Sequence, residues 1–311
     1  MKIANLKKQA DNLFVGNEED FIKALKIILE INGIDNRSNI KVGFITKAYA
    51  KLRLTNKKEQ NDIYLNFIET IAKHNNLIGQ LTLGKFFQYG NAFNSACFEK
   101  AEICYQNLIK NSNLEKTKYI PEALYNMALW YLERDIIKAQ KYLIDSAKNC
   151  YIPAFKKLFE LQNSGKITKE SNAIIFNSHK DKNIWNNADK IIFACCSLYG
   201  IGMEQNIDEA VILFTELTFN FVCEPKLICF VAEYFCDKNW EEYFIISPTE
   251  MLKIAVNRGD MIGKFLYGKL LFLQKDKTPE IKNEAVVLLS KSAFSGFDEA
   301  INFFIEHKTK K

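Results

Sequence analysis

Two adjacent cysteines, Cys195 and Cys196, are the residues of this sequence best suited by type to nucleophilic chemistry. A reactive cysteine needs a neighbouring cation or a histidine base, because the thiolate is the attacking species. In a helix, no His or Lys would lie three or four residues from either cysteine. None of the eight cysteines forms a C-x-x-C pair, and most lie at apolar positions of predicted helices. The pattern therefore favours reduced thiols that pack as small hydrophobic side chains.

Metal and phosphate chemistry are equally poorly supported. The three histidines, His74, His179 and His307, lie far apart in the chain and match no zinc-binding spacing on a helix. The element Gly200-Ile201-Gly202 follows a predicted helix and lacks both the preceding strand and the Lys-Ser/Thr pair of a phosphate loop. The sequence therefore predicts neither a metal nor a cofactor, and it predicts no enzyme.

Charge and hydropathy bear on the class of partner. The formal net charge is only +5 over 311 residues, and the segment 141–157 comes closest to interleaving aromatic residues with lysines. We expect no nucleic-acid binding, and we interpret Lys308–Lys311 as a solvated basic tail. No run of 18 apolar residues is present, so no membrane insertion is expected. The N-terminal segment lacks the apolar core of a signal peptide, which predicts a cytoplasmic location; secretion by a signal-independent route stays open.

A motif that combines small residues, Leu and aromatic residues recurs along the chain and must position any functional side chain. Its clearest copies span residues 79–90, 122–133, 190–202 and 263–274. The aligned positions recur on average about every 37 residues, which suits two helices of three to four turns with short connections. They are Gly84, Ala128, Phe159, Ala194, Val231 and Gly268. Such periodicity is typical of a stacked repeat array, in which neighbouring units bury one continuous core.

The second half of each unit shows the apolar spacing of an amphipathic helix, in residues 98–109, 135–147, 206–217 and 282–293. Small residues recur at fixed points of both helices. We expect those of the first helix to lie where the second helix crosses closely: Gly84, Ala128, Ala194 and Gly268. The reciprocal positions on the second helix are Ala101, Ala139, Ala210 and Ala285. A larger side chain there would force the helix axes apart.

The best copy of the whole pattern, FACCSLYGIGMEQNIDEAVILFTEL at residues 193–217, resembles the Sel-one-like repeat family, which is related to the tetratricopeptide repeats. The segment SKSAFSGFDEA at residues 290–300 keeps the family's Ala, Gly and next-repeat Ala at matching offsets. The resemblance covers about residues 76–307, although Cys104, Tyr142, Leu213 and Leu288 replace the family's Trp. It implies an all-α, right-handed α-solenoid of antiparallel helix-turn-helix repeats.

The domain organisation follows from where the motif is recognisable. Residues 1–75 match it poorly but contain amphipathic segments at 21–31 and 61–74, separated by breaks at 33–39 and 56–59, so we expect a degenerate helical N-terminal cap. Residues 76–307 form the predicted repeat array, and residues 308–311 form the basic tail. The polar segment 163–187 lacks a clear first helix and predicts a bend in the array.

The resemblance also implies a function. In tetratricopeptide-like arrays the first helices line a concave face that holds a partner, and the corresponding positions here are Lys85, Gln88, Tyr89, Tyr125, Glu133, Tyr199, Phe265 and Lys269. We therefore expect a non-enzymatic scaffold or adaptor that binds a protein or peptide, of bacterial origin by its Lys-, Asn- and Ile-rich composition. The alternatives are an immunity-type or regulatory protein that controls an enzyme or toxin, and a cysteine-dependent enzyme. The aromatic residues among these positions could equally fill gaps between units.

Overall fold

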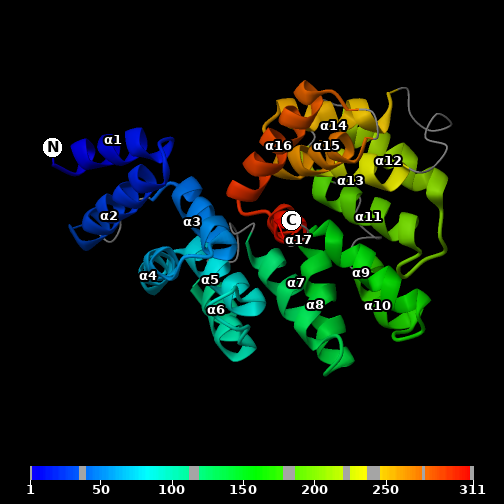
Figure 1. Cartoon of the computed structure of the whole chain (residues 1–311). Helices are drawn as coiled ribbons and strands as arrows, with labels where there is room; N and C mark the ends of the chain where they lie inside the picture. The colour runs from blue at the N-terminus through cyan, green and yellow to red at the C-terminus, as the bar shows by residue number, and fades with distance from the viewer. Residues whose placement is uncertain are drawn as a thin grey trace. The chain divides into compact units, whose positions relative to one another are not determined.

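The structure is a computed structural model that describes residues 2–34, 40–111, 119–177, 186–219, 225–236, 246–274 and 277–308. The described residues form 17 α-helices and no β-strand (Figure 1). The predicted all-α fold of helix pairs is thereby confirmed. Contacts divide the chain into two compact units: unit 1 comprises Met1–Thr117 together with Ser290–Lys311, and unit 2 comprises Lys118–Leu289. None of the described helices is long and apolar enough to cross a membrane.

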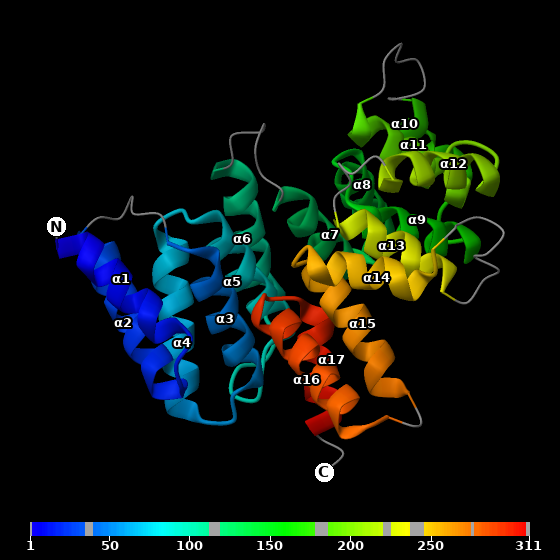
Figure 2. The same cartoon turned by 90° about the horizontal axis from the view of Figure 1, so that it is seen from above.

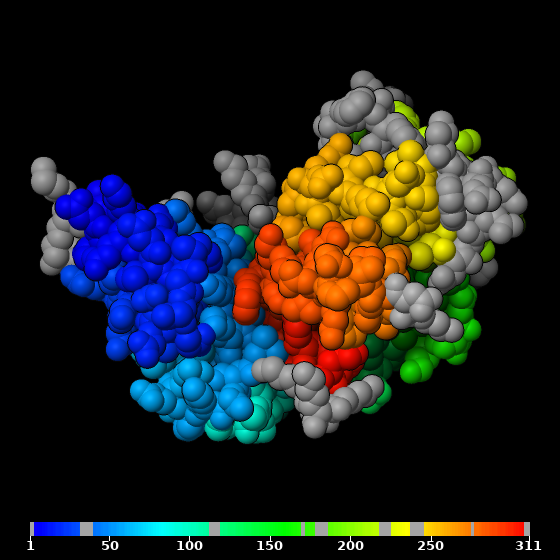
Figure 3. All heavy atoms as spheres, turned by 45° about the horizontal axis from the view of Figure 1, so that its top comes forward, coloured from blue at the N-terminus to red at the C-terminus, as the bar shows by residue number. Residues whose placement is uncertain are grey.

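Unit 1 is built from seven helices and the end of an eighth. Helix α1 packs on α2, α3 on α4, α4 on α5 and α5 on α6, and the C-terminal helix α17 packs on α3 (Figure 2). In the space-filling view, α1 and α2 form a continuous surface of side chains (Figure 3). The helices are α1 (Lys2–Phe14), α2 (Glu18–Ile34), α3 (Val42–Leu54), α4 (Lys58–Lys73), α5 (Leu77–Tyr89), α6 (Phe98–Asn111) and α17 (Asp298–Lys308).

One partly buried ionic contact joins three helices of unit 1, namely α2, α3 and α4. Glu18 of α2 accepts hydrogen bonds from Lys51 of α3 and Tyr64 of α4. Burial alone would raise the pKa of Glu18, but these two hydrogen bonds and the positive charges of Lys51 and Lys47 together outweigh it and hold the pKa below its ordinary value. The carboxylate is therefore stabilised by the fold around it.

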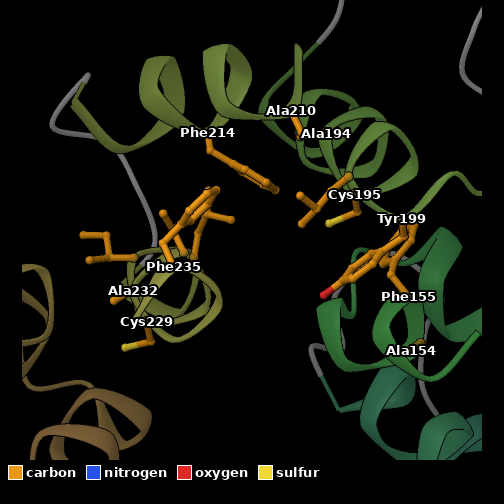
Figure 4. Packing of buried hydrophobic residues seen from close by; sticks show 14 of the residues in the cluster. Ala154, Phe155, Ala194, Cys195, Tyr199, Ala210, Phe214, Cys229, Ala232 and Phe235 are labelled. Atoms are coloured by element: carbon orange, nitrogen blue, oxygen red, sulfur yellow. The ribbon is translucent and has the colours of Figure 1, made fainter. Parts of the chain in front are cut away.

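Unit 2 continues the succession of helices. Its core contains side chains from α9, α11, α12 and α13 that point into a shared interior, among them Phe155, Cys195, Phe214 and Phe235 (Figure 4). The helices are α7 (Ile120–Tyr131), α8 (Ile136–Lys148), α9 (Ile152–Asn163), α10 (Lys169–Asn177), α11 (Asn187–Tyr199), α12 (Ile207–Phe219), α13 (Pro225–Phe235), α14 (Pro248–Asn257), α15 (Met261–Leu273) and α16 (Pro279–Phe294), of which α16 continues from unit 2 into unit 1.

The predicted close crossings are confirmed at the small residues of the helix pairs. A Cβ atom added to Gly84 of α5 would lie 2.5 Å from the ring of Tyr105 on α6. One added to Gly268 of α15 would lie 3.1 Å from Cβ of Leu288 on α16. The alanines at the other aligned positions have no exposed surface: Ala101, Ala128, Ala139, Ala194, Ala210 and Ala285. Small side chains therefore allow the two helices of a pair to approach closely.

One turn recurs where a second helix passes into the next first helix. Its central residue has a left-handed backbone conformation, at Asn75 (φ 58°), Cys150 (φ 61°), Gly259 (φ 83°) and Gly296 (φ 85°). Four residues after each comes a buried small residue near the start of the following helix: Gly79, Ala154, Gly263 and Ala300. A left-handed residue ends a helix and reverses the chain within a few residues. The spacing seen in the sequence at residues 290–300 is thus one of four copies of this turn among the residues that the structure describes.

Other predicted boundaries differ in detail or lie outside the described residues. Helix α2 extends into the predicted break at 33–39 as far as Ile34, and residues 35–39 are not described. The segment 163–187 contains helix α10, and residues 178–185 are not described, so the bend stays a prediction. The same holds for the limits of the N-terminal cap and of the repeat array. The side chains of the basic tail, residues 308–311, lie outside the described part.

Candidate functional site

A group of buried polar side chains in unit 1 joins α3 and α5 to α17. Lys85 of α5 places Nζ 2.6 Å from Oδ2 of Asp298, the first residue of α17, and donates a hydrogen bond of 3.2 Å to the carbonyl oxygen of Gly296. The hydroxyl of Tyr49 on α3 donates to Oδ1 of the same carboxylate. Lys85 is only 5% exposed. Its charge is therefore stabilised mainly by this carboxylate and carbonyl rather than by water.

Arg53 of α3 completes this group, which we name the acid-binding site (Tyr49, Arg53 and Lys85). Nη1 of Arg53 lies 3.7 Å from Oδ1 of Asp298 and donates to the hydroxyl of Tyr49 at 3.1 Å. Nη2 donates to Oδ1 of Asn302 at 3.1 Å. Arg53 is 8% exposed, and its Nε atom is buried without a hydrogen-bond partner among the described residues. The guanidinium thus contacts two side chains that are one turn apart on α17.

The fold positions the site through one face of α3. Thr46, Tyr49 and Arg53 are spaced three and four residues apart, so their side chains share that face. A Cβ atom added to Gly296 would lie 3.2 Å from Cβ of Thr46, so the turn before α17 lies directly against α3. Gly296 also has a left-handed backbone. Both the conformation and the close approach require glycine at this position.

Burial controls the protonation of the tyrosines around the site. It raises the pKa of Tyr49 well above its usual value, and the nearby carboxylate of Asp298 raises it further. The hydroxyl consequently remains a hydrogen-bond donor at physiological pH. Tyr105 is also fully buried and donates to Oε1 of Gln88 at 2.7 Å. The arrangement can therefore bind a carboxylate through two cations and a hydroxyl donor.

Three of the sequence-predicted partner-binding residues lie on α5 beside this site. Lys85 belongs to the site itself, and Gln88 accepts the hydrogen bond from Tyr105. Tyr89 is 37% exposed, and its ring centre lies 4.9 Å from the guanidinium of Arg53. Burial, followed by the carboxylate of Asp298, raises the pKa of Tyr89. The structure therefore places Lys85 against the C-terminal helix α17 and Tyr89 against Arg53, whereas Gln88 contacts Tyr105 of α6.

The other five predicted residues lie in unit 2, on α7, α11 and α15 and just after α7. Tyr199 is buried, and its ring centre lies 5.1 Å from that of Phe159 and 6.1 Å from that of Tyr234. Tyr125 is partly buried, 5.3 Å from the ring of Tyr151. These contacts favour the alternative in which aromatic side chains fill gaps between units.

Phe265 of α15 is also buried, with Nζ of Lys269 lying 5.8 Å from its ring centre. Lys269 and Glu133 are exposed. In unit 2, the predicted residues that present a charge to the surface are therefore Glu133 and Lys269. Whether any of the eight residues contacts a partner stays a prediction.

Sequence reasoning missed Tyr49, Arg53, Asp298 and Asn302. Tyr49 and Arg53 lie in the N-terminal segment, where the repeat motif is not recognisable, so no alignment marked them. Asp298 offered a weak signal, because an acidic residue in the first turn of a helix is favoured by the helix dipole. The contact between Tyr49 and Asp298 spans 249 residues of sequence. Local spacing contains no information about such a pairing.

The cysteine candidates are not arranged for catalysis. Cys195 and Cys196 are fully buried; burial raises the pKa of Cys196 to about 12 and that of Cys195 well above its ordinary value. A thiol that stays protonated is a poor nucleophile. His307 places Nδ1 2.7 Å from the carbonyl oxygen of Phe303, and His74 ends α4, whereas His179 is not described. Among the described residues, no three His, Cys, Asp or Glu side chains gather as metal ligands would.

The helix pairs, their close crossings and the shared turn define this chain as an α-helical repeat protein. No family model matches it, and no curated protein matches it. Among solved structures, it is similar to a protective antigen present in uropathogenic Escherichia coli strains that displays an SLR fold, with 14% identity and a TM-score of 0.40. The match covers 96% of this chain but only 62% of the antigen's chain. It is also similar to a Sel1 repeat protein from Oxalobacter formigenes, with 14% identity, a TM-score of 0.38 and coverage of 98% and 90%.

Proposed function

We propose that this protein is a non-enzymatic interaction scaffold, whose first helices hold a helical segment of a partner protein. The observation that carries the proposal is the acid-binding site, where side chains of α3 and of the first helix α5 hold the helix α17 through a carboxylate. A surface that can hold one helix by buried cations has the chemistry needed to hold another of the same kind.

The energetics of the site support recognition rather than a passive contact. Hydrogen bonds to a charged group contribute about 1.5–3 kcal/mol each, roughly twice as much as those between neutral groups. Removing one partner of a buried ion pair costs about 3–5 kcal/mol, since the remaining charge is left without compensation. The cations of the acid-binding site therefore discriminate strongly between a helix that supplies a carboxylate and one that does not.

Two other functions compete with the scaffold. A cysteine-dependent enzyme is disfavoured because burial keeps the thiols of Cys195 and Cys196 protonated. A regulatory or immunity-type protein, which binds and controls an enzyme or toxin, would use the same binding chemistry. It differs from a passive adaptor in one measurable respect, because the captured partner would lose or gain activity when bound.

Site-specific photo-crosslinking in the native cell tests the scaffold proposal. A photoreactive phenylalanine analogue is placed in turn at Tyr89, Tyr125 and Lys269, on first helices. Matched control positions are exposed isoleucines of the second helices: Ile103, Ile137 and Ile212. We expect the first-helix positions to capture one common protein, which mass spectrometry identifies, and the control positions to capture it much less.

Capture of the same protein mainly from the isoleucine positions would refute the placement of the binding surface on the first helices. Addition of the purified protein to the captured partner, followed by an assay of the partner's own activity, separates the adaptor from the regulator.

A further inference from the structure

We propose that the acid-binding site recognises a helix that begins with an aspartate and carries an asparagine one turn later, and that α17 is a built-in occupant with which a partner helix competes. The inference rests on the proposed scaffold function and names the class of partner: an amphipathic helix with an acidic first turn. Its basis is the way in which α3 and α5 contact α17 inside unit 1.

The first element of recognition is the carboxylate. Oδ2 of Asp298 contacts Nζ of Lys85 at 2.6 Å, while Oδ1 accepts from the hydroxyl of Tyr49 and lies 3.7 Å from Nη1 of Arg53. Both oxygens of one carboxylate are thus engaged from two different helices. Since Lys85 and Arg53 are almost fully buried, a neutral residue in place of the aspartate would leave two cations without this compensation.

The second element sets the register of the bound helix. Arg53 donates to Oδ1 of Asn302 through Nη2 while its Nη1 faces Asp298. These two residues of α17 are four apart and therefore lie on the same face of the helix. A planar guanidinium can contact both groups at once through its two Nη atoms, whereas the single ammonium of a lysine cannot. The site therefore requires both an Asp and an Asn in the bound helix, and it requires them to be four residues apart.

The third element is the backbone that precedes the helix. Lys85 donates to the carbonyl oxygen of Gly296, and that glycine lies directly against Thr46 of α3. Downstream, Ala300, Ile301 and Phe303 are buried, so the ligand presents an apolar face in addition to its acidic first turn. The segment that the site recognises reads Gly-Phe-Asp-Glu-Ala-Ile-Asn at residues 296–302.

Covalent attachment determines how such a site would exchange its occupant. A tethered helix acts at an effective concentration on the order of millimolar, so a free helix of equal intrinsic affinity binds weakly while α17 is in place. Weakening the contacts of α17 removes that competition and raises the apparent affinity for a helix in trans. Weakening the acid-binding site itself has the opposite effect. Substitutions at the two ends of the Lys85–Asp298 ion pair are therefore expected to change the affinity for a free helix in opposite directions.

The test uses the full chain and a fluorescein-labelled peptide with the sequence of residues 290–308, with binding followed by fluorescence anisotropy. Asp298→Asn in the chain is expected to bind the peptide at least about tenfold more tightly than the wild-type chain. Adding Lys85→Met to the Asp298→Asn chain should abolish that gain. A control peptide that carries Asn in place of its aspartate should bind neither chain.

Circular dichroism verifies that each variant retains its helical content. Asn302→Ala provides a second, milder release of α17 that leaves the Lys85–Asp298 pair intact, and it should raise the affinity for the peptide by a smaller factor. Equal affinity of all folded chains for the peptide, or no binding by any of them, would overturn the inference. Dimerisation of the wild-type chain that Asp298→Asn abolishes would overturn the occupancy by α17 in cis and identify a second copy as the partner.

The two proposals fail separately. Loss of the peptide effect, with crosslinking at Tyr125 and Lys269 still capturing one partner, would remove this inference and leave the scaffold function in place. If Asp298→Asn raises the affinity for the peptide but no first-helix position crosslinks to a partner, recognition is confined to the acid-binding site.

Discussion

Replacement of Gly84 by alanine is expected to destabilise unit 1, although alanine is the better helix former. Gly84 lies inside α5, where a Cβ atom would stand 2.5, 2.8 and 3.0 Å from three ring carbons of Tyr105 on α6. Ordinary carbon–carbon contacts lie at about 3.5–4.0 Å. The ring must therefore move by about 1 Å, but Tyr105 is fully buried and its hydroxyl is hydrogen-bonded to Gln88.

Two opposing terms set the magnitude. Alanine in a helix interior is favoured over glycine by about 1 kcal/mol. An extra methyl group in a closely packed crossing costs about 1–3 kcal/mol. The overlap at Gly84 is with a side chain that has no room to yield, so we place the packing cost in the upper half of this range. The net expectation is a loss of about 1–2 kcal/mol in the free energy of unfolding.

Urea denaturation followed by circular dichroism measures this loss. Gly43→Ala in α3 is the matched control, because a Cβ atom there would lie 3.5 Å from the nearest atom, Cζ of Phe14, which is ordinary contact. We expect Gly43→Ala to be neutral or stabilising. Gly84→Ala introduced together with Tyr105→Leu should cost less than in the wild-type background, since the clashing ring is absent.

Stability of Gly84→Ala equal to or greater than that of the wild type would refute the reasoning. So would a cost that is unchanged in the Tyr105→Leu background, because the loss would then not arise from the crossing of α5 and α6.

Three further predictions concern protonation, packing and thiol reactivity. Because hydrogen bonding lowers the folded-state pKa of Glu18, its contribution to stability is present above about pH 4.5 and is lost as the pH falls through the folded-state pKa. Glu18→Gln should therefore lower stability at pH 7 and flatten the fall of the urea midpoint below pH 4.5; an unchanged profile would contradict this. Tyr199→Ala should cost about 3–5 kcal/mol in urea denaturation, because the ring packs in a buried aromatic cluster. Weaker partner binding at unchanged stability would instead favour its role as a binding residue. In the native protein at pH 8, iodoacetamide should alkylate the exposed Cys236 and spare the buried Cys196 until the chain is denatured, as read by peptide mass mapping. Rapid native alkylation of Cys196 would reopen the case for a reactive thiol.

The amino-acid sequence by itself determined the helix pairs and the way neighbouring helices cross. The apolar spacing of each segment defines one helix, and the small residues at Gly84 and Gly268 mark where two helices approach. These features can be predicted from the sequence because the helices of a pair are also neighbours in sequence. Their packing therefore repeats with the period of the sequence motif. The turn with a left-handed residue is local as well, and its copy at Gly296 was visible in the sequence.

Only the tertiary structure decided what the predicted first-helix residues contact. Its position in the motif places Lys85 on the predicted partner-binding face, yet it is buried against Asp298 of α17. No local spacing encodes which helices far apart in the sequence pack against each other. A contact between residues 249 positions apart, such as that of Tyr49 with Asp298, therefore emerges only when the whole chain is folded.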